Sequence, residues 1–146
     1  MKKTILATLA IALGWALTAA AFTAPTAEQI DAAAADPATQ LAALLQDASV
    51  NQAAAIAAAV AERIAALGLS AADQTARLDQ TIQALFAAIP SIHHETLAVA
   101  FGEAMAGVTG MSSAGFASIR TALGTTDGGD TLLSSFDQSF AAAGGT

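Results

Sequence analysis

Residues 49–68 read SVNQAAAIAAAVAERIAALG, and this stretch decides the fold class. Ser49, followed three residues later by Gln52, forms a capping-box pattern that marks the start of a helix. Large apolar residues then recur every three or four positions, which is the period of an α-helix, and Gly68 follows the last of them. The stretch therefore predicts one amphipathic helix. Its apolar stripe is Ile56, Val60, Ile64 and Leu67.

A second helix is predicted directly after this one. Ser70 with Asp73 indicates its start, and Pro90 ends it because proline cannot continue a helix. Asp73 and Arg77 stand four residues apart, a spacing at which opposite charges on a helix attract each other. The stripe of this helix is the clearest in the chain and consists of Leu78, Ile82, Leu85 and Ile89.

Two more helices are predicted before residue 125. Ser91 is expected to cap a helix that Gly110 closes, and the next helix runs from about Ser113 to Leu123, followed by Gly124. The stripe of the first contains Leu97, Phe101, Met105 and Val108, and that of the second contains Phe116, Ile119 and Leu123.

Two short helices are predicted on the N-terminal side of residue 49. Thr26 with Gln29 opens the first of them, which includes Ile30. Asp36 followed by Pro37 opens the second, because aspartate is a good N-cap and proline fits the first helical turn. The second helix has the stripe Leu41, Leu44 and Leu45.

The predicted serine caps are evenly spaced along the chain. Ser49, Ser70, Ser91 and Ser112 are 21 residues apart, so each unit is one helix and a very short turn. Short connections favour antiparallel neighbours. The units do not match position by position, which argues against a sequence repeat. We therefore expect an all-α protein, a small antiparallel helical bundle of about five to seven short helices, with a helix-hairpin solenoid as the alternative.

The C-terminal end is predicted to form a separate element. The bundle is expected over residues 22–124, a Gly/Asp linker over 125–130, and a final helix with a frayed tail over 131–146. Phe136 and Phe140 lie four residues apart in this helix. Two phenylalanines on so short an element predict that it covers a groove, either of its own domain or of a partner.

Residues 1–21 have the pattern of a signal peptide. Lys2 and Lys3 precede an uncharged apolar run, and small residues follow, which predicts cleavage after Ala21. Cleavage after Ala20 is the second choice. An uncleaved anchor is the alternative, since 21 uncharged helical residues reach roughly the 30 Å of a bilayer core. The prediction is an exported protein, periplasmic or extracellular.

The composition excludes several classes of function. Alanine accounts for 42 of the 146 residues, and its high helix propensity lets helices form with few bulky anchors. The chain contains no cysteine, so thiolate chemistry is excluded, and without the leader it contains no lysine for a Schiff base. Three arginines against twelve acidic residues then give a net charge of 3 − 12 = −9. This charge repels nucleic acid.

Two clusters are weak candidates for metal binding. His93, His94 and Glu95 are the only concentrated titratable set, but adjacent helical residues diverge by about 100°, so an ion would need a ligand from another helix. The alternative is a polar first helical turn. Asp127 and Asp130 lie in a Gly-rich segment that offers oxygen ligands to calcium, although the spacing matches no EF-hand.

Residues 110–114, Gly-Met-Ser-Ser-Ala, imitate the nucleophile elbow of a hydrolase. An elbow needs a glycine at the position of Ala114 and a strand before it, whereas a helix is predicted there. A serine cap explains the same residues, so hydrolysis by Ser112 or Ser113 is only a third hypothesis.

Ala98, Gly102 and Ala106 form a strip of small residues four apart on one predicted helix. A glycine in mid-helix costs about 1 kcal/mol relative to alanine, so another element is expected to approach closely. The two options are packing inside the chain, for example against the alanines of residues 54–61, and self-association.

Together these features predict an exported, acidic, non-enzymatic protein with a structural or protein-interaction role in the cell envelope or outside the cell. We expect a protein partner or self-association, and neither a cofactor nor nucleic acid. A small-molecule or metal-binding bundle in the periplasm is the alternative. The predicted interaction residues are Ala98, Gly102, Ala106, Phe136 and Phe140.

Overall fold

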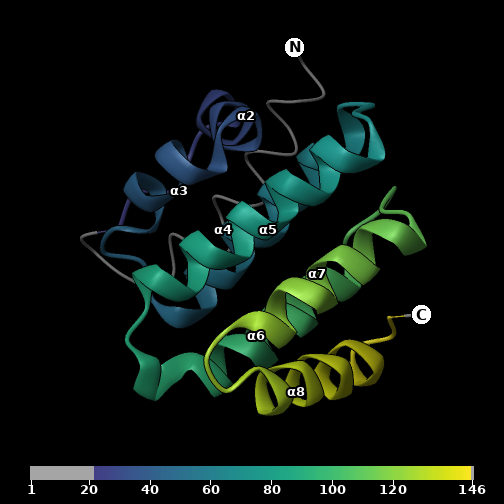
Figure 1. The fold of residues 1–146 in the computed structure, drawn as a ribbon. Coiled ribbons are helices and arrows are strands. Elements are labelled where there is room, and N and C mark those ends of the chain that lie inside the picture. Colours follow the sequence, from purple (N-terminus) through teal and green to yellow (C-terminus); the bar gives the residue numbers. More distant parts are fainter. Residues whose placement is uncertain (1–21, 146) are drawn as a thin grey trace.

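The computed structural model describes residues 22–145, and all regular structure in this range is helical (Figure 1). The prediction of an all-α fold is confirmed. The leader predicted over residues 1–21 lies outside the described range. The elements are α2 (Ala27–Ala35), α3 (Pro37–Leu45), α4 (Val50–Ala66), α5 (Ala71–Ala88), the 3₁₀ turn η1 (Ser91–His93), α6 (His94–Ala106), α7 (Ser113–Thr125) and α8 (Gly129–Ala142).

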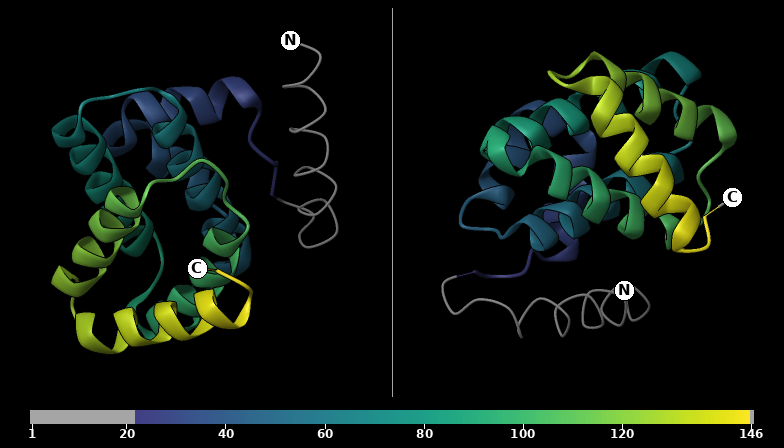
Figure 2. Two further views of the ribbon diagram at one scale, coloured as in Figure 1. Left: turned by 90° about the vertical axis from the view of Figure 1, so that its right-hand side faces the viewer. Right: turned by 90° about the horizontal axis from the view of Figure 1, so that it is seen from below.

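The helices form a small bundle in which each packs against the next but one along the chain. One row runs from α2 through α4 and α6 to α8, and the other runs from α3 through α5 to α7. Figure 1 shows α5 and α7 side by side, and α8 lies along α6 and contacts α7. Figure 2 shows how α8 closes the bundle at the end opposite α2. This arrangement is the small helical bundle that the sequence predicted.

Helix α4 is the centre of the bundle, and its alanines explain why. It contacts α2, α3, α5 and α6, and nine of its residues are buried. Small side chains on several sides of one helix let several neighbours approach it closely. The few large residues on α4 then fill the space between neighbours. The buried set is Gln52, Ala53, Ala54, Ile56, Ala57, Ala58, Val60, Ala61 and Ile64.

The capping box predicted at Ser49 is confirmed, and Thr26 and Gln29, which were predicted to open the first helix, form a second one. The Ser49 N–H donates to Gln52 Oε1 (2.8 Å) and the Gln52 N–H donates to Ser49 Oγ (3.2 Å), with the same reciprocal pair between Thr26 and Gln29. Each box satisfies two amide groups that the first helical turn leaves without an internal partner. The predicted caps Asp36, Ser70 and Ser112 also accept an amide hydrogen at the start of their helices.

The prediction that Ser91 caps a helix is wrong. Pro90 is followed by η1, and α6 begins only at His94 with no side-chain cap. Because the 3₁₀ turn intervenes, α5 and the segment Ser91–Ala106 are bent by 111° relative to each other rather than antiparallel. The equal spacing of the serines therefore does not mean equal structure.

Two details of the stripes and ion pairs also differ from the predictions. Leu67 is 39% exposed because it follows α4 as the C-cap, beyond the packed stripe. Arg77 donates from Nη1 to the Ala34 carbonyl (3.2 Å), so it is held by α2 and not by Asp73.

Among residues 22–145 no single helix has the length and apolar character needed to cross a bilayer. Within the same range, α5 taken together with the bent segment Ser91–Ala106 meets that criterion of length and composition.

Candidate functional site

Gly102 marks a close approach of two helices, α6 and α8. It is buried on α6, and a Cβ atom at this position would lie 2.5 Å from the Phe136 carbonyl oxygen and 3.1 Å from the Phe140 nitrogen, both on α8. The Ser139 hydroxyl, which donates to the Phe136 carbonyl (3.0 Å), would also clash with that Cβ. The predicted close contact therefore exists. Its partner is α8 and not the alanines of α4.

The predicted anchors Phe136 and Phe140 are buried in their own chain, at 0% and 6% exposure. Phe136 packs against Phe101 of α6 with ring centroids 5.6 Å apart, and Phe140 packs against Phe116 of α7 at 5.1 Å. The final helix thus packs against its own domain, which is one of the two options that the sequence predicted. The expected linker over residues 125–130 is shortened to residues 126–128, because α7 extends to Thr125 and α8 begins at Gly129.

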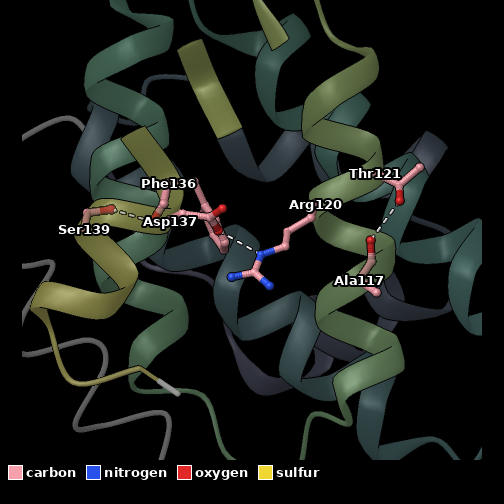
Figure 3. Close-up of polar contacts among 6 residues, drawn as sticks. All are labelled: Ala117, Arg120, Thr121, Phe136, Asp137 and Ser139. Atoms are coloured by element: carbon pink, nitrogen blue, oxygen red, sulfur yellow. Dashed lines mark hydrogen bonds and ion pairs between the residues drawn. The ribbon is translucent and has the colours of Figure 1, made fainter. Parts of the chain in front are cut away.

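An exposed ion pair adds to this docking from the α7 side. Arg120 Nε lies 2.8 Å from Asp137 Oδ1, and Figure 3 shows the guanidinium reaching across to α8 beside the Ser139–Phe136 hydrogen bond. The Thr121 hydroxyl on α7 donates to the Ala117 carbonyl of the same helix (2.9 Å). Exposed ion pairs of this kind contribute about 0–1 kcal/mol, so the phenylalanines hold α8 in place.

Gly102 of the predicted strip and the predicted anchors Phe136 and Phe140 therefore meet in the same contact between α6 and α8. Ala98 is fully buried and Ala106 is half-buried. At Gly102 the strip is covered by α8 of the same chain.

His94 has a structural position at the α5–α6 bend. Its Nε2 lies 2.8 Å from the carbonyl oxygens of both Phe86 and Ile89, and its ring meets the Phe86 ring edge-on at 5.0 Å. Carbonyls only accept, so Nε2 carries the proton and donates to the end of α5. This nitrogen is therefore engaged as a helix C-cap and not directed toward an ion.

Neither predicted metal candidate gathers enough ligands. His93 and Glu95, on either side of His94, are exposed, and so are Asp127 and Asp130. Within the described residues, no three His, Cys, Asp or Glu side chains are grouped so as to hold a metal ion.

Ser112 is the N-cap of α7, and its hydroxyl accepts the Gly115 amide hydrogen at 3.1 Å. The segment before it is a turn that follows α6, with Gly110 at a φ of 79°. A helix and a turn stand where a nucleophile elbow requires a strand, as predicted from the sequence. Ser113 is the first residue of α7 and is exposed.

A groove that the sequence analysis did not anticipate lies between the C-terminal ends of α3 and α5. We call it the α3–α5 groove; its volume is about 590 Å³. The floor is formed by Leu45 and Ile89, which are 3% and 7% exposed. Ile92, just beyond it on η1, is 84% exposed. The full lining is Ala42, Ala43, Leu45, Gln46, Asp47, Ala48, Ala88, Ile89 and Pro90.

The rim of the α3–α5 groove is electronegative. Two helices end at it, and a helix C-terminus carries a partial negative charge. Neither α3 nor α5 has a basic residue in its last turn. Asp47 adds a carboxylate, and its backbone is left-handed with a φ of 64°. No sequence pattern predicted this site because residues 42–48 and 88–90 meet only through the packing of α3 on α5.

A second groove, of about 670 Å³, runs between α5 and α7. Apart from Asp79, its walls carry only alanine, serine and threonine side chains, and Thr75 Oγ1 and Ser118 Oγ are hydrogen-bonded across it at 2.9 Å. It offers no large apolar anchor.

Comparison with known proteins gives no relative: the chain matches no protein family, no curated protein and no solved structure.

Proposed function

We propose that this is an exported, non-enzymatic helical protein that acts through protein contacts in the cell envelope or outside the cell. The proposal rests on how the charged side chains of the chain are paired. All three arginines are occupied by the chain itself: Arg63 and Arg120 pair with Asp31 and Asp137, and Arg77 binds a backbone carbonyl.

Ten of the twelve acidic side chains are consequently without an ion-pair partner among the described residues. A surface with many unpaired carboxylates and no free arginine favours partners of opposite charge and repels polyanions. This supports a role in binding other proteins over a role in binding nucleic acid.

The buried hydrophobic core gives a second line of support. Residues from each of the seven α-helices in the described part of the chain belong to one core, which α8 completes. A bundle with one continuous core suits a module that presents a preformed outer surface to a partner.

Export is tested by expressing the full-length chain in a bacterium, separating cytoplasm from periplasm and medium, and measuring intact mass. We expect protein outside the cytoplasm with a mass that begins at Phe22. The control is the double variant Lys2→Glu, Lys3→Glu, which should retain the leader and remain in the cytoplasm. Accumulation of unprocessed wild-type protein in the cytoplasm would contradict export.

The non-enzymatic, protein-binding part is tested separately on the purified protein. We expect no labelling of Ser112 or Ser113 by a fluorophosphonate probe, and no thermal shift with zinc, copper or calcium ions. Covalent labelling of either serine would overturn the proposal in favour of a hydrolase. A metal-induced shift that His93→Ala abolishes would overturn it in favour of the metal-binding alternative.

A further inference from the structure

We propose that the α3–α5 groove binds a basic, amphipathic segment of a partner protein, with the apolar side chains of that segment in the groove and a lysine or arginine at its rim. This inference rests on the proposed function and names the surface and the chemistry of the partner.

The shape and lining of the groove suit apolar side chains. Seven of its nine lining residues are alanine, leucine, isoleucine or proline, and the only others are Gln46 and Asp47. Its volume is about 590 Å³, and it is open to the surface rather than enclosed. Leu45 and Ile89 give it a floor that already belongs to the hydrophobic core. A bound side chain would extend that core rather than rest on a polar surface.

Ile92 provides an apolar contact beside the groove. At 84% exposure it is by far the most exposed of the large hydrophobic residues in the described chain; Leu67 and Val99 are 39% and 36% exposed. Its backbone lies in the bend between Pro90 and His94, whose Nε2 lies 2.8 Å from the Ile89 carbonyl oxygen. An exposed isoleucine two residues along the chain from a groove wall can pack against one side of a segment lying in that groove.

The charge around the groove selects a cation. Asp47 lies between the end of α3 and Ser49, the N-cap of α4, and its carboxylate adds a full negative charge to the groove. The C-terminus of α3 contributes a partial negative charge and has no basic residue in its last turn, whereas His94 donates to carbonyls at the end of α5. A lysine or arginine from a partner would pair with Asp47 and be stabilised at the end of α3, because cations are favoured at helix C-termini.

A second copy of this chain is a poorer occupant. The three arginines that another copy could offer are engaged in Arg63–Asp31, in Arg120–Asp137 and in the Arg77–Ala34 hydrogen bond. Two copies with a charge of 3 − 12 = −9 over residues 22–146 would also repel each other. The charge therefore favours a different, basic protein.

The test uses protein purified after expression of the full-length chain, labelled with ¹⁵N, and an 18-residue amphipathic helix of leucine and lysine as the probe. We expect saturable binding with amide shifts concentrated at residues 42–48 and 88–92. A leucine–glutamate helix should not bind, and a glycine–lysine peptide without an apolar face should bind at least about tenfold more weakly.

Two matched double variants locate the site. Asp47→Asn with Ile92→Ser removes one carboxylate and one exposed apolar side chain at the groove, and is expected to weaken binding about tenfold. Asp130→Asn with Leu67→Ser also removes one carboxylate and one exposed apolar side chain, but outside the groove. This variant should bind the probe like wild type. If the first double variant does not fold, Ala43→Arg, at an exposed wall position, replaces it and should also weaken binding.

Three results would overturn the inference. The first is that the leucine–lysine helix does not bind. The second is that both double variants weaken its binding equally and that the amide shifts are spread over the whole surface. The third is that the glycine–lysine peptide binds as tightly as the leucine–lysine helix. Dimers in light scattering that Ile92→Ser dissociates would assign the groove to a second copy instead. None of these results affects the export and labelling tests of the proposed function, so the two proposals fail separately.

Discussion

Gly102 on α6 faces the backbone of Phe136 on α8 so closely that a Cβ atom at residue 102 would lie 2.5 Å from the Phe136 carbonyl oxygen. A backbone carbonyl cannot move aside as the end of a flexible side chain can. The glycine therefore sets the distance between the two helices. The contact between Phe101 on α6 and Phe136 on α8 depends on this distance.

Substituting Gly102→Ala is expected to destabilise the protein by about 2 kcal/mol, although alanine has the better helix propensity. The matched control is Gly124→Ala on α7, where nothing lies within 4 Å of the added Cβ and a gain of about 0.5–1 kcal/mol is expected. Urea unfolding of both variants measures the two opposite changes. Stabilisation by Gly102→Ala would show that α8 does not approach as described.

Substituting Ser49→Ala is expected to cost about 1 kcal/mol, because it breaks the capping box with Gln52 at the start of the central helix. Ser91→Ala at the same 21-residue spacing should change stability by less than about 0.5 kcal/mol, since Ser91 is exposed and makes no capping hydrogen bond. Thermal unfolding compares the pair. Equal losses would mean that Ser91 also caps a helix.

Substituting His94→Ala is expected to cost about 1–2 kcal/mol, because it leaves the carbonyls of Phe86 and Ile89 without their donor and removes the ring contact with Phe86. The neighbouring His93→Ala is the control and should be nearly neutral, since His93 is exposed. Chemical denaturation of the two variants tests this. A neutral His94→Ala would refute its role as the C-cap of α5.

The left-handed backbone of Asp47, with φ of 64°, predicts an order of stability among its variants. Asp47→Gly should be the most stable, because glycine adopts this conformation without steric cost and the variant also removes a carboxylate from a helix C-terminus. Asp47→Asn should resemble wild type, and Asp47→Ala should be about 1 kcal/mol less stable than wild type. The melting temperatures of the wild type and the three variants give the order of stability. If the alanine variant is as stable as the glycine variant, the left-handed conformation of residue 47 is contradicted.

The sequence by itself determined the helices. Capping residues act on amides three positions away, and the apolar stripes follow from the period of the helix, so both are local. Ser49–Gln52, Thr26–Gln29 and the stripe from Leu78 to Ile89 were predicted and are confirmed for this reason. The prediction for Ser91 failed because a 3₁₀ turn follows Pro90, and the serine lies in this turn and not at the start of the helix that it was expected to cap.

Only the tertiary structure decided what the faces of the helices touch. The spacing of Ala98, Gly102 and Ala106 predicted a close contact. Its partner residues on α8, Phe136 and Ser139, are 34 and 37 positions beyond Gly102 and are selected by their fit against it. The α3–α5 groove likewise joins residues 42–48 to 88–90 through the packing of two helices. Contacts of this kind depend on shape complementarity across the whole bundle, and a local pattern of residues does not predict them.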